Sequence, residues 1–124
     1  MTGDPAEAGA RIRRAVLGDA YVDRGGSEFA APFRDYVINS AWGQVWSRPG
    51  LDRRTRSCLT IALLAALRCE EELALHVAGA LRNGVTPAEV QEVLLHTAVY
   101  AGAPAANAAF AVAARVIAEL EDDG

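Results

Sequence analysis

Two residues suited to proton transfer, Glu72 and His76, lie four apart in a segment expected to be helical. Because four residues bring a helix back to the same face, the carboxylate and the imidazole point the same way, one turn apart. A carboxylate can orient an imidazole and stabilise its protonated form, which makes such a pair fit for general acid-base catalysis. An ordinary contact between helical neighbours explains the same spacing. Proton transfer and a structural role are therefore alternatives at this pair.

The second histidine repeats the pattern, since His96 and Tyr100 are also four residues apart, in an apolar surrounding. They are second-choice proton donors, and a core or interface role is the alternative. Two histidines twenty residues apart, together with Glu72, could in principle form a site with two histidines and a carboxylate. The sequence has no HExxH or other compact ligand motif. We therefore predict no metal.

Three arginines, Arg53, Arg54 and Arg56, follow Asp52 within one turn of an expected helix start. Positive charge at a helix N-terminus opposes the macrodipole, so an anion should offset it. That anion is either a carboxylate of a substrate or a neighbouring Asp or Glu side chain. Arg53 and Arg56 are three apart and can share a helix face, whereas Arg54 points elsewhere.

Composition excludes several classes of function. All 12 basic residues are arginines, so chemistry that needs a lysine Schiff base is ruled out. The net charge of -4 lacks the basic footprint of a nucleic-acid-binding protein. No signal-peptide pattern is visible, and Cys58 and Cys69 form no disulfide framework, which favours the cytoplasm. With 52% apolar residues in 124, the chain has more hydrophobic surface than one small core can hide, so we expect a homo-oligomer.

Helix signals run along the whole chain, and no segment shows the alternation of a strand, so we predict an all-α fold in a single domain, residues 1–124. The LTIALLAAL run from Leu59 to Leu67 is apolar nearly all round and is expected to be buried. The uncharged stretch from Val93 to Ala114 is interrupted at Gly102-Ala103-Pro104, which predicts two soluble helices and no membrane span. Six helices are expected, at about Asp4–Gly18, Pro32–Trp46, Asp52–Arg68, Glu70–Asn83, Thr86–Gly102 and Pro104–Leu120.

Longer stretches of sequence resemble the 4-carboxymuconolactone decarboxylase family, with unbroken order from about Arg14 to Arg115. This resemblance implies an all-helical subunit and a cofactor-free lyase of the β-ketoadipate pathway for protocatechuate breakdown. It also implies a ring-shaped homo-oligomer, usually a hexamer. The stretches that carry it are WGQVWSRPGLDRRTRS (Trp42 to Ser57), EEELALH (Glu70 to His76), NGVTP (Asn83 to Pro87) and VYAGAPAAN (Val99 to Asn107).

One motif departs from a neighbouring group in the same superfamily. The alkylhydroperoxidase-type disulfide reductases carry Cys-x-x-Cys-x-x-x-His, whereas this chain reads Cys69-x-x-Glu72-x-x-x-His76. A carboxylate replaces the second thiol, so thiol-disulfide exchange lacks its partner. Cys69 is then incidental, and Arg68-Cys69 is the main local departure from the decarboxylases.

The implied reaction needs little from the protein. The electrons that CO2 leaves behind delocalise onto the conjugated lactone carbonyl. The enzyme therefore has only to hold carboxylates, stabilise the dienolate oxygen and protonate a ring carbon. The resemblance and the arginine chemistry together assign Arg53 and Arg56 to carboxylate binding and Trp46 to a wall of the site. A binding protein for another small carboxylated ligand and a thiol- or metal-dependent oxidoreductase remain the alternatives.

The proton-transfer unit is expected to be Glu72 with His76. His76 either donates a hydrogen bond to the dienolate oxygen or delivers the proton. His96 and Tyr100 are expected to line the same cavity as further donors. The predicted partner is thus a small carboxylated lactone.

Overall fold

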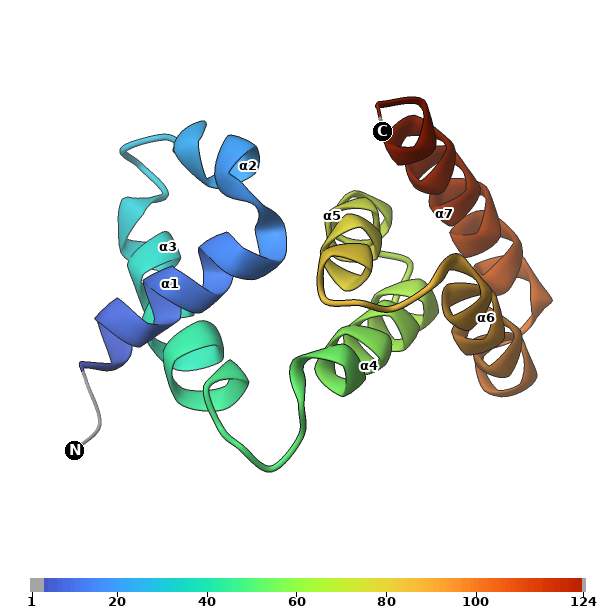
Figure 1. Cartoon of the computed structure of the whole chain (residues 1–124), viewed down its shortest axis with the longest axis horizontal. Coiled ribbons are helices and arrows are strands. Elements are labelled where there is room, and N and C mark those ends of the chain that lie inside the picture. Colours follow the sequence, from blue (N-terminus) through green and yellow to red (C-terminus); the bar gives the residue numbers. More distant parts are fainter. Residues whose placement is uncertain (1–3, 124) are drawn as a thin grey trace. The chain divides into compact units, whose positions relative to one another are not determined.

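The computed structural model describes residues 4–123, and every regular element in that range is helical (Figure 1). The predicted all-α class is therefore confirmed. The residues divide after Asp52 into two compact units, which we call unit 1 and unit 2. The single-domain organisation stays a prediction. Unit 1 contains α1 (Pro5–Leu17), α2 (Asp19–Asp23), α3 (Ala31–Val37) and the π-helix η1 (Ile38–Trp46), and unit 2 contains α4 (Arg53–Ala66), α5 (Glu70–Arg82), α6 (Pro87–Ala101) and α7 (Ala103–Asp123).

Unit 1 is built on the close packing of α1 against η1. Two glycines make this approach possible: a Cβ atom on Gly9 would collide with the carbonyl oxygen of Ile38, and one on Gly43 with that of Pro5. Trp42 is buried beside this crossing. Any larger residue at either glycine would push the two backbones apart.

Unit 1 differs from expectation in two places. The expected helix Pro32–Trp46 is continuous in the chain but changes from α-helix to π-helix at Ile38. Its wider turns have i→i+5 hydrogen bonds, which an apolar pattern does not distinguish from α-helix. The short helix α2 was not predicted, because its five residues are too few to show a helical period.

Unit 2 has four helices, in which α4 and α7 each pack on both α5 and α6. α5 and α6 do not pack closely on each other. The core is aliphatic, with Ile61, Leu73 and Leu94 almost fully buried. The boundaries agree with the predicted ones to within about three residues, because their caps are local signals. Thr86 and Glu89, for example, form the expected capping box of α6.

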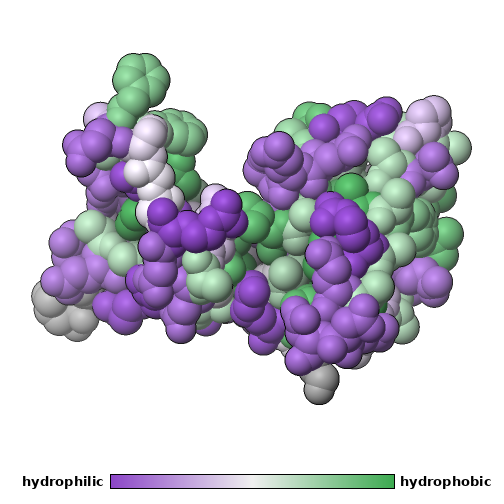
Figure 2. Space-filling view, turned by 90° about the horizontal axis from the view of Figure 1, so that it is seen from above, coloured by the Kyte–Doolittle hydropathy of each residue, from purple (hydrophilic) through white to green (hydrophobic). Residues whose placement is uncertain are grey.

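One prediction about unit 2 was wrong. The leucine run of α4 is not buried all round: Ile61 and Ala65 face the core, whereas Leu59, Leu63 and Leu67 are exposed. Figure 2 likewise shows hydrophobic residues at the surface of both units. A continuous apolar run carries no period, so it cannot show which of its sides is covered.

The uncharged stretch of unit 2 is divided as expected. Gly102 has a φ of 98°, which only glycine adopts without strain, and it separates α6 from α7. Among the helices of residues 4–123, α7 is the one that is long and apolar enough to cross a membrane by length and composition, and 33% of its apolar window is buried inside the protein. A core helix of a soluble protein passes the same test.

Candidate functional site

The antiparallel hairpin of α4 and α5 positions four of the seven predicted site residues. Its open end is fixed by the side chain of Asn83, whose Nδ2 donates to the Oγ of buried Ser57 over 2.9 Å. The guanidinium Nε of Arg54 donates to the carbonyl oxygen of Gly84 over 3.3 Å. The start of α4 therefore lies beside the end of α5.

Arg54 of the arginine cluster has a neighbouring carboxylate as its counter-ion. It forms an ion pair with Glu89, and the same carboxylate accepts the backbone N–H of Thr86 over 2.9 Å. These two hydrogen bonds hold the pKa of Glu89 down at about 2. For Arg54 the neighbouring-carboxylate alternative is thus correct.

Arg53 and Arg56 lie in the first turn of α4, one residue before and two after Arg54. Arg53 is exposed, whereas Arg56 is half-buried and has its Nε atom inside the protein. Both remain candidates for carboxylate binding. Guanidinium groups suit this role because their planar fork can bond a carboxylate bidentately.

His76 is half-buried on α5, with its Nδ1 atom inside the protein. Burial lowers its pKa from 6.5 to about 4, so the imidazole is neutral at pH 7. Glu72 lies one turn earlier and is exposed. Desolvation is the cause of this shift, and the pairing of Glu72 with His76 stays a prediction.

The two halves of the predicted site lie toward different ends of the hairpin. Glu72 precedes Asn83 by eleven residues, and Asn83 marks the level of Ser57, one turn into α4. At ~1.5 Å per residue, Glu72 is about 16 Å along α5 from the level of the arginines. His76 is about 10 Å from it by the same rule. One chain does not bring Arg53 and Glu72 together.

His96 and Tyr100 are on α6, which does not pack closely on α5. Their rings contact each other, with centroids 5.2 Å apart and planes inclined by 42°. Both are exposed, Tyr100 to 81%. The unit does not enclose them in a cavity with His76, and their role as further donors stays a prediction.

Trp46 belongs to unit 1, at the end of η1. Its ring lies 4.9 Å from that of Trp42, with the planes inclined by 33°. π-Helical segments are frequent at functional sites, which fits a wall residue. That role also stays a prediction.

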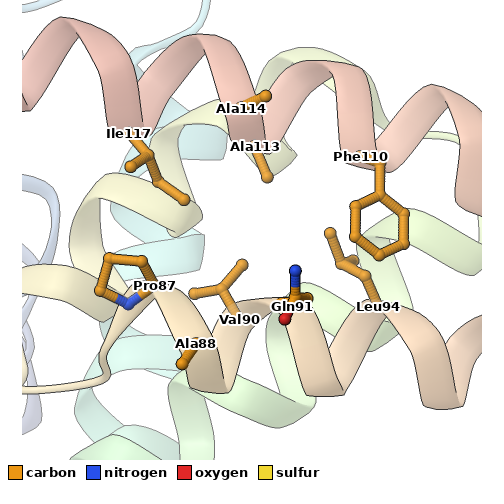
Figure 3. Close-up of a pocket in the computed structure, with 9 residues that line it drawn as sticks. All are labelled: Pro87, Ala88, Val90, Gln91, Leu94, Phe110, Ala113, Ala114 and Ile117. Carbon is orange, nitrogen blue, oxygen red and sulfur yellow. The ribbon is translucent and has the colours of Figure 1, made fainter.

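A groove of about 290 Å³ lies between α6 and α7 (Figure 3). Phe110 and Leu94 close one end and Ile117 and Pro87 the other, with Gln91 as the polar group on the floor. No charged side chain lines it, and none of the predicted site residues does. It is therefore unsuited to a substrate with carboxylates.

The turn between α4 and α5 contains Arg68 and Cys69. Arg68 has a φ of 62°, a left-handed conformation that costs a side-chain-bearing residue about 1 kcal/mol or more. Cys69 follows as the cap residue of α5 without a capping side-chain hydrogen bond, and its thiol donates to Leu67 O over 3.8 Å. Between residues 4 and 123, no three His, Cys, Asp or Glu side chains gather closely enough to hold a metal ion.

The residues that sequence reasoning missed are those that fix the hairpin: Ser57, Asn83 and the pair of Arg54 with Glu89. Glu89 was visible as the capping-box residue of α6, but its ion pair spans 35 positions. No local pattern connects residues so far apart. Only the packing of α4 against α6 shows the connection.

Comparison with known proteins agrees with this architecture. Residues 31–115 match the model of the carboxymuconolactone decarboxylase family. The chain belongs to that family. The chain is 45% identical over 115 residues to 4-carboxymuconolactone decarboxylase of Acinetobacter baylyi, which covers 90% of this chain and 86% of the relative. It is also 41% identical over 121 residues to nitrosuccinic acid decarboxylase of Metarhizium robertsii, covering 95% and 85%.

Proposed function

We propose that this family member is a carboxy-lyase that decarboxylates 4-carboxymuconolactone to the enol-lactone of the β-ketoadipate pathway. The observation that carries the proposal is the 45% identity to a 4-carboxymuconolactone decarboxylase across most of both chains. The protein acts in the cytoplasm, in protocatechuate breakdown, as a homo-oligomer and most simply a hexamer. It needs no nucleic-acid or membrane partner.

The reaction follows from the substrate. When the carbon–carboxylate bond breaks, CO2 leaves. The electron pair of the broken bond moves through the double bond to the lactone carbonyl oxygen. Arg53 and Arg56 hold the carboxylates, and a neutral imidazole N–H at His76 donates to the developing dienolate oxygen. A proton added to a ring carbon completes the enol-lactone. Glu72 orients the imidazole.

The second relative supports decarboxylation as the reaction, but it does not support the lactone as the substrate. Nitrosuccinic acid, which the name of this relative gives as its substrate, also has a carboxylate, and the electrons of its carbon–carboxylate bond can move onto a neighbouring electron-withdrawing group. We therefore include nitrosuccinic acid as the competing substrate. If the protein turns over nitrosuccinic acid but not the lactone, the assignment as a decarboxylase stands and the lactone is not its substrate.

The decisive experiment is an ultraviolet assay with enzymatically generated 4-carboxymuconolactone. We expect turnover by the wild type, and kcat/KM lower by at least about tenfold in Arg53→Lys and Arg56→Lys, because lysine keeps the charge but loses the fork. Arg115→Lys on α7, which pairs with Glu119 at the surface, is the matched control and should be unchanged. Wild-type protein that leaves both substrates untouched would refute the proposal, and normal kinetics in both lysine variants would remove the arginines from the site.

A further inference from the structure

The outer face of α4 carries an apolar stripe that no helix of unit 2 covers. Leu59, Leu63 and Leu67 follow one another at four-residue spacing and are exposed to 49%, 61% and 69%. Four-residue spacing places Leu59 and Leu63 in one row along α4. Leu67 is the residue after the end of α4, and it continues the row because its N–H still donates to the carbonyl oxygen of Leu63. A row of leucines on a helix is normally covered by a partner surface.

The stripe is complementary to itself. If two copies of α4 lie antiparallel about a two-fold axis at Leu63, that residue meets its own copy, and Leu59 meets Leu67 of the partner subunit. Every leucine of the row is then covered by a leucine, as in an isologous interface. A hexamer with dihedral symmetry contains such two-fold axes.

Charge supports the same arrangement. Arg56 lies seven residues before Leu63 and Glu70 seven residues after it, so the pairing places the basic start of α4 beside the acidic start of α5 of the partner subunit. Glu70, Glu71 and Glu72 are all exposed, and within residues 4–123 none of them forms an ion pair. The antiparallel pairing therefore brings opposite charges together at both ends of the contact.

The pairing also shortens the separation between the arginines and Glu72 that is seen within one chain. Arg53 and Glu72 lie toward opposite ends of the α4–α5 hairpin, whereas across the axis the arginines of one copy reach the level of Glu72 of the other. We propose that a second copy of this chain docks on the α4 stripe, and that each site combines Arg53 and Arg56 of one copy with Glu72 and His76 of the other. The sharing of the site rests on the proposed function, but the docking does not.

Cysteine cross-linking tests the docking and its register. In a background with Cys58→Ser and Cys69→Ser, Leu63→Cys should give a covalent dimer on oxidation with copper phenanthroline. Leu59→Cys and Leu67→Cys should each give little alone, because their copies lie about 12 Å apart across the axis, beyond disulfide reach. An equal mixture of these two variants should cross-link. No dimer from Leu63→Cys, or equal cross-linking by all three single variants, would overturn the interface.

Mixed subunits test the shared site. The chain with Arg53→Ala and Arg56→Ala and the chain with His76→Asn should each be nearly inactive when assembled alone. Co-expressed and purified by two tags, they should recover activity, because one of the two sites in a mixed dimer then has all its intact residues. Because one of its two sites is intact, the purified mixed dimer should have about one half of the wild-type rate. Activity no higher than in the parents, with mixed dimers present, would overturn the sharing.

The two proposals fail in different ways. If wild-type protein does not turn over the lactone, the proposed function fails, and the cross-linking pattern still decides the interface. If the wild type is active and the Leu63→Cys dimer does not form, the function stands and the interface fails.

Discussion

Burial, and not a neighbouring carboxylate, controls the charge of His76. A buried imidazole loses the hydration that stabilises its cation, which is why its pKa lies at about 4 rather than 6.5. The neutral ring is then present throughout the neutral range. Glu72 remains available to orient it, one helical turn away.

This protonation state gives a prediction for the pH dependence. Because the neutral ring is the working form, kcat/KM for decarboxylation should stay nearly constant from pH 7 down to about 5 and fall only near pH 4, where His76 becomes protonated in the free enzyme. If Glu72 instead kept the ring protonated, activity would fall as pH rises past 6.5 or above. Steady-state rates across pH, with assembly checked at each pH, separate the two outcomes.

The same measurement in variants shows whether the pair works as one unit. Glu72→Gln and His76→Asn should each lower the rate by about 10²–10⁴-fold. Their double variant should be little worse than the poorer single one, because members of one unit fail together. If the losses multiply, or if an assembled His76→Asn protein keeps near-normal turnover, the pair has a structural role. His96 is then the next proton donor to test.

Among the elements, the crossing of α1 and η1 has the tightest steric requirement. Gly9 lies inside a helix, where alanine would ordinarily stabilise by ~1 kcal/mol. At this crossing the added methyl group meets the backbone of η1, which cannot move away as a side chain can. Helix propensity would raise the free energy of unfolding of an alanine variant at Gly9, and the collision would lower it, so a substitution shows which effect is larger.

We predict that Gly9→Ala lowers the free energy of unfolding by about 1–3 kcal/mol. Both tryptophans of the chain are in η1, so their fluorescence during urea unfolding reports on unit 1. Gly50→Ala, where a Cβ meets nothing within 4 Å, is the matched control and should change little. A stabilised Gly9→Ala protein would mean that the crossing is looser than described.

The elements also show where sequence reasoning succeeds. Thr86, Glu89 and Gly102 mark their helix ends through local hydrogen bonds or backbone conformation, so the boundaries of unit 2 were predictable. The π-helix was not, because a change of hydrogen bonding at Ile38 leaves the apolar pattern unchanged. Nor was the direction of the α4 leucines, since it depends on which helices pack around them. The candidate site was predictable as residue types, but its distribution along the hairpin needed the pairing of Ser57 with Asn83.

At the scale of the whole molecule, the exposed leucines connect stability to assembly. A stripe that is covered only between copies stabilises the folded state more as the copies become more concentrated, because association removes folded chains from the unfolding equilibrium. The unfolding temperature of an oligomer whose subunits stabilise one another in this way depends on the protein concentration.

We therefore expect Tm to rise with protein concentration, for example between 1 and 100 micromolar chain. Leu63→Glu should remove this dependence, because it places like charges against each other on the axis. Leu120→Glu changes an exposed leucine outside the stripe and should keep it. The measurement is differential scanning fluorimetry at a series of concentrations, together with sedimentation. A wild-type Tm independent of concentration, with a monomer in sedimentation, would refute the assembly.

The single-residue break at Gly102 also has a consequence for how unit 2 folds. α6 and α7 pack on each other across a link of one residue, and α4 and α5 are joined by only the three residues from Leu67 to Cys69. Short links make loop closure cheap, and contacts that are close in sequence form early. Each hairpin can therefore form before the two meet. The long uncharged stretch is folded back on itself at this first step, which shortens the time in which it is open to aggregation.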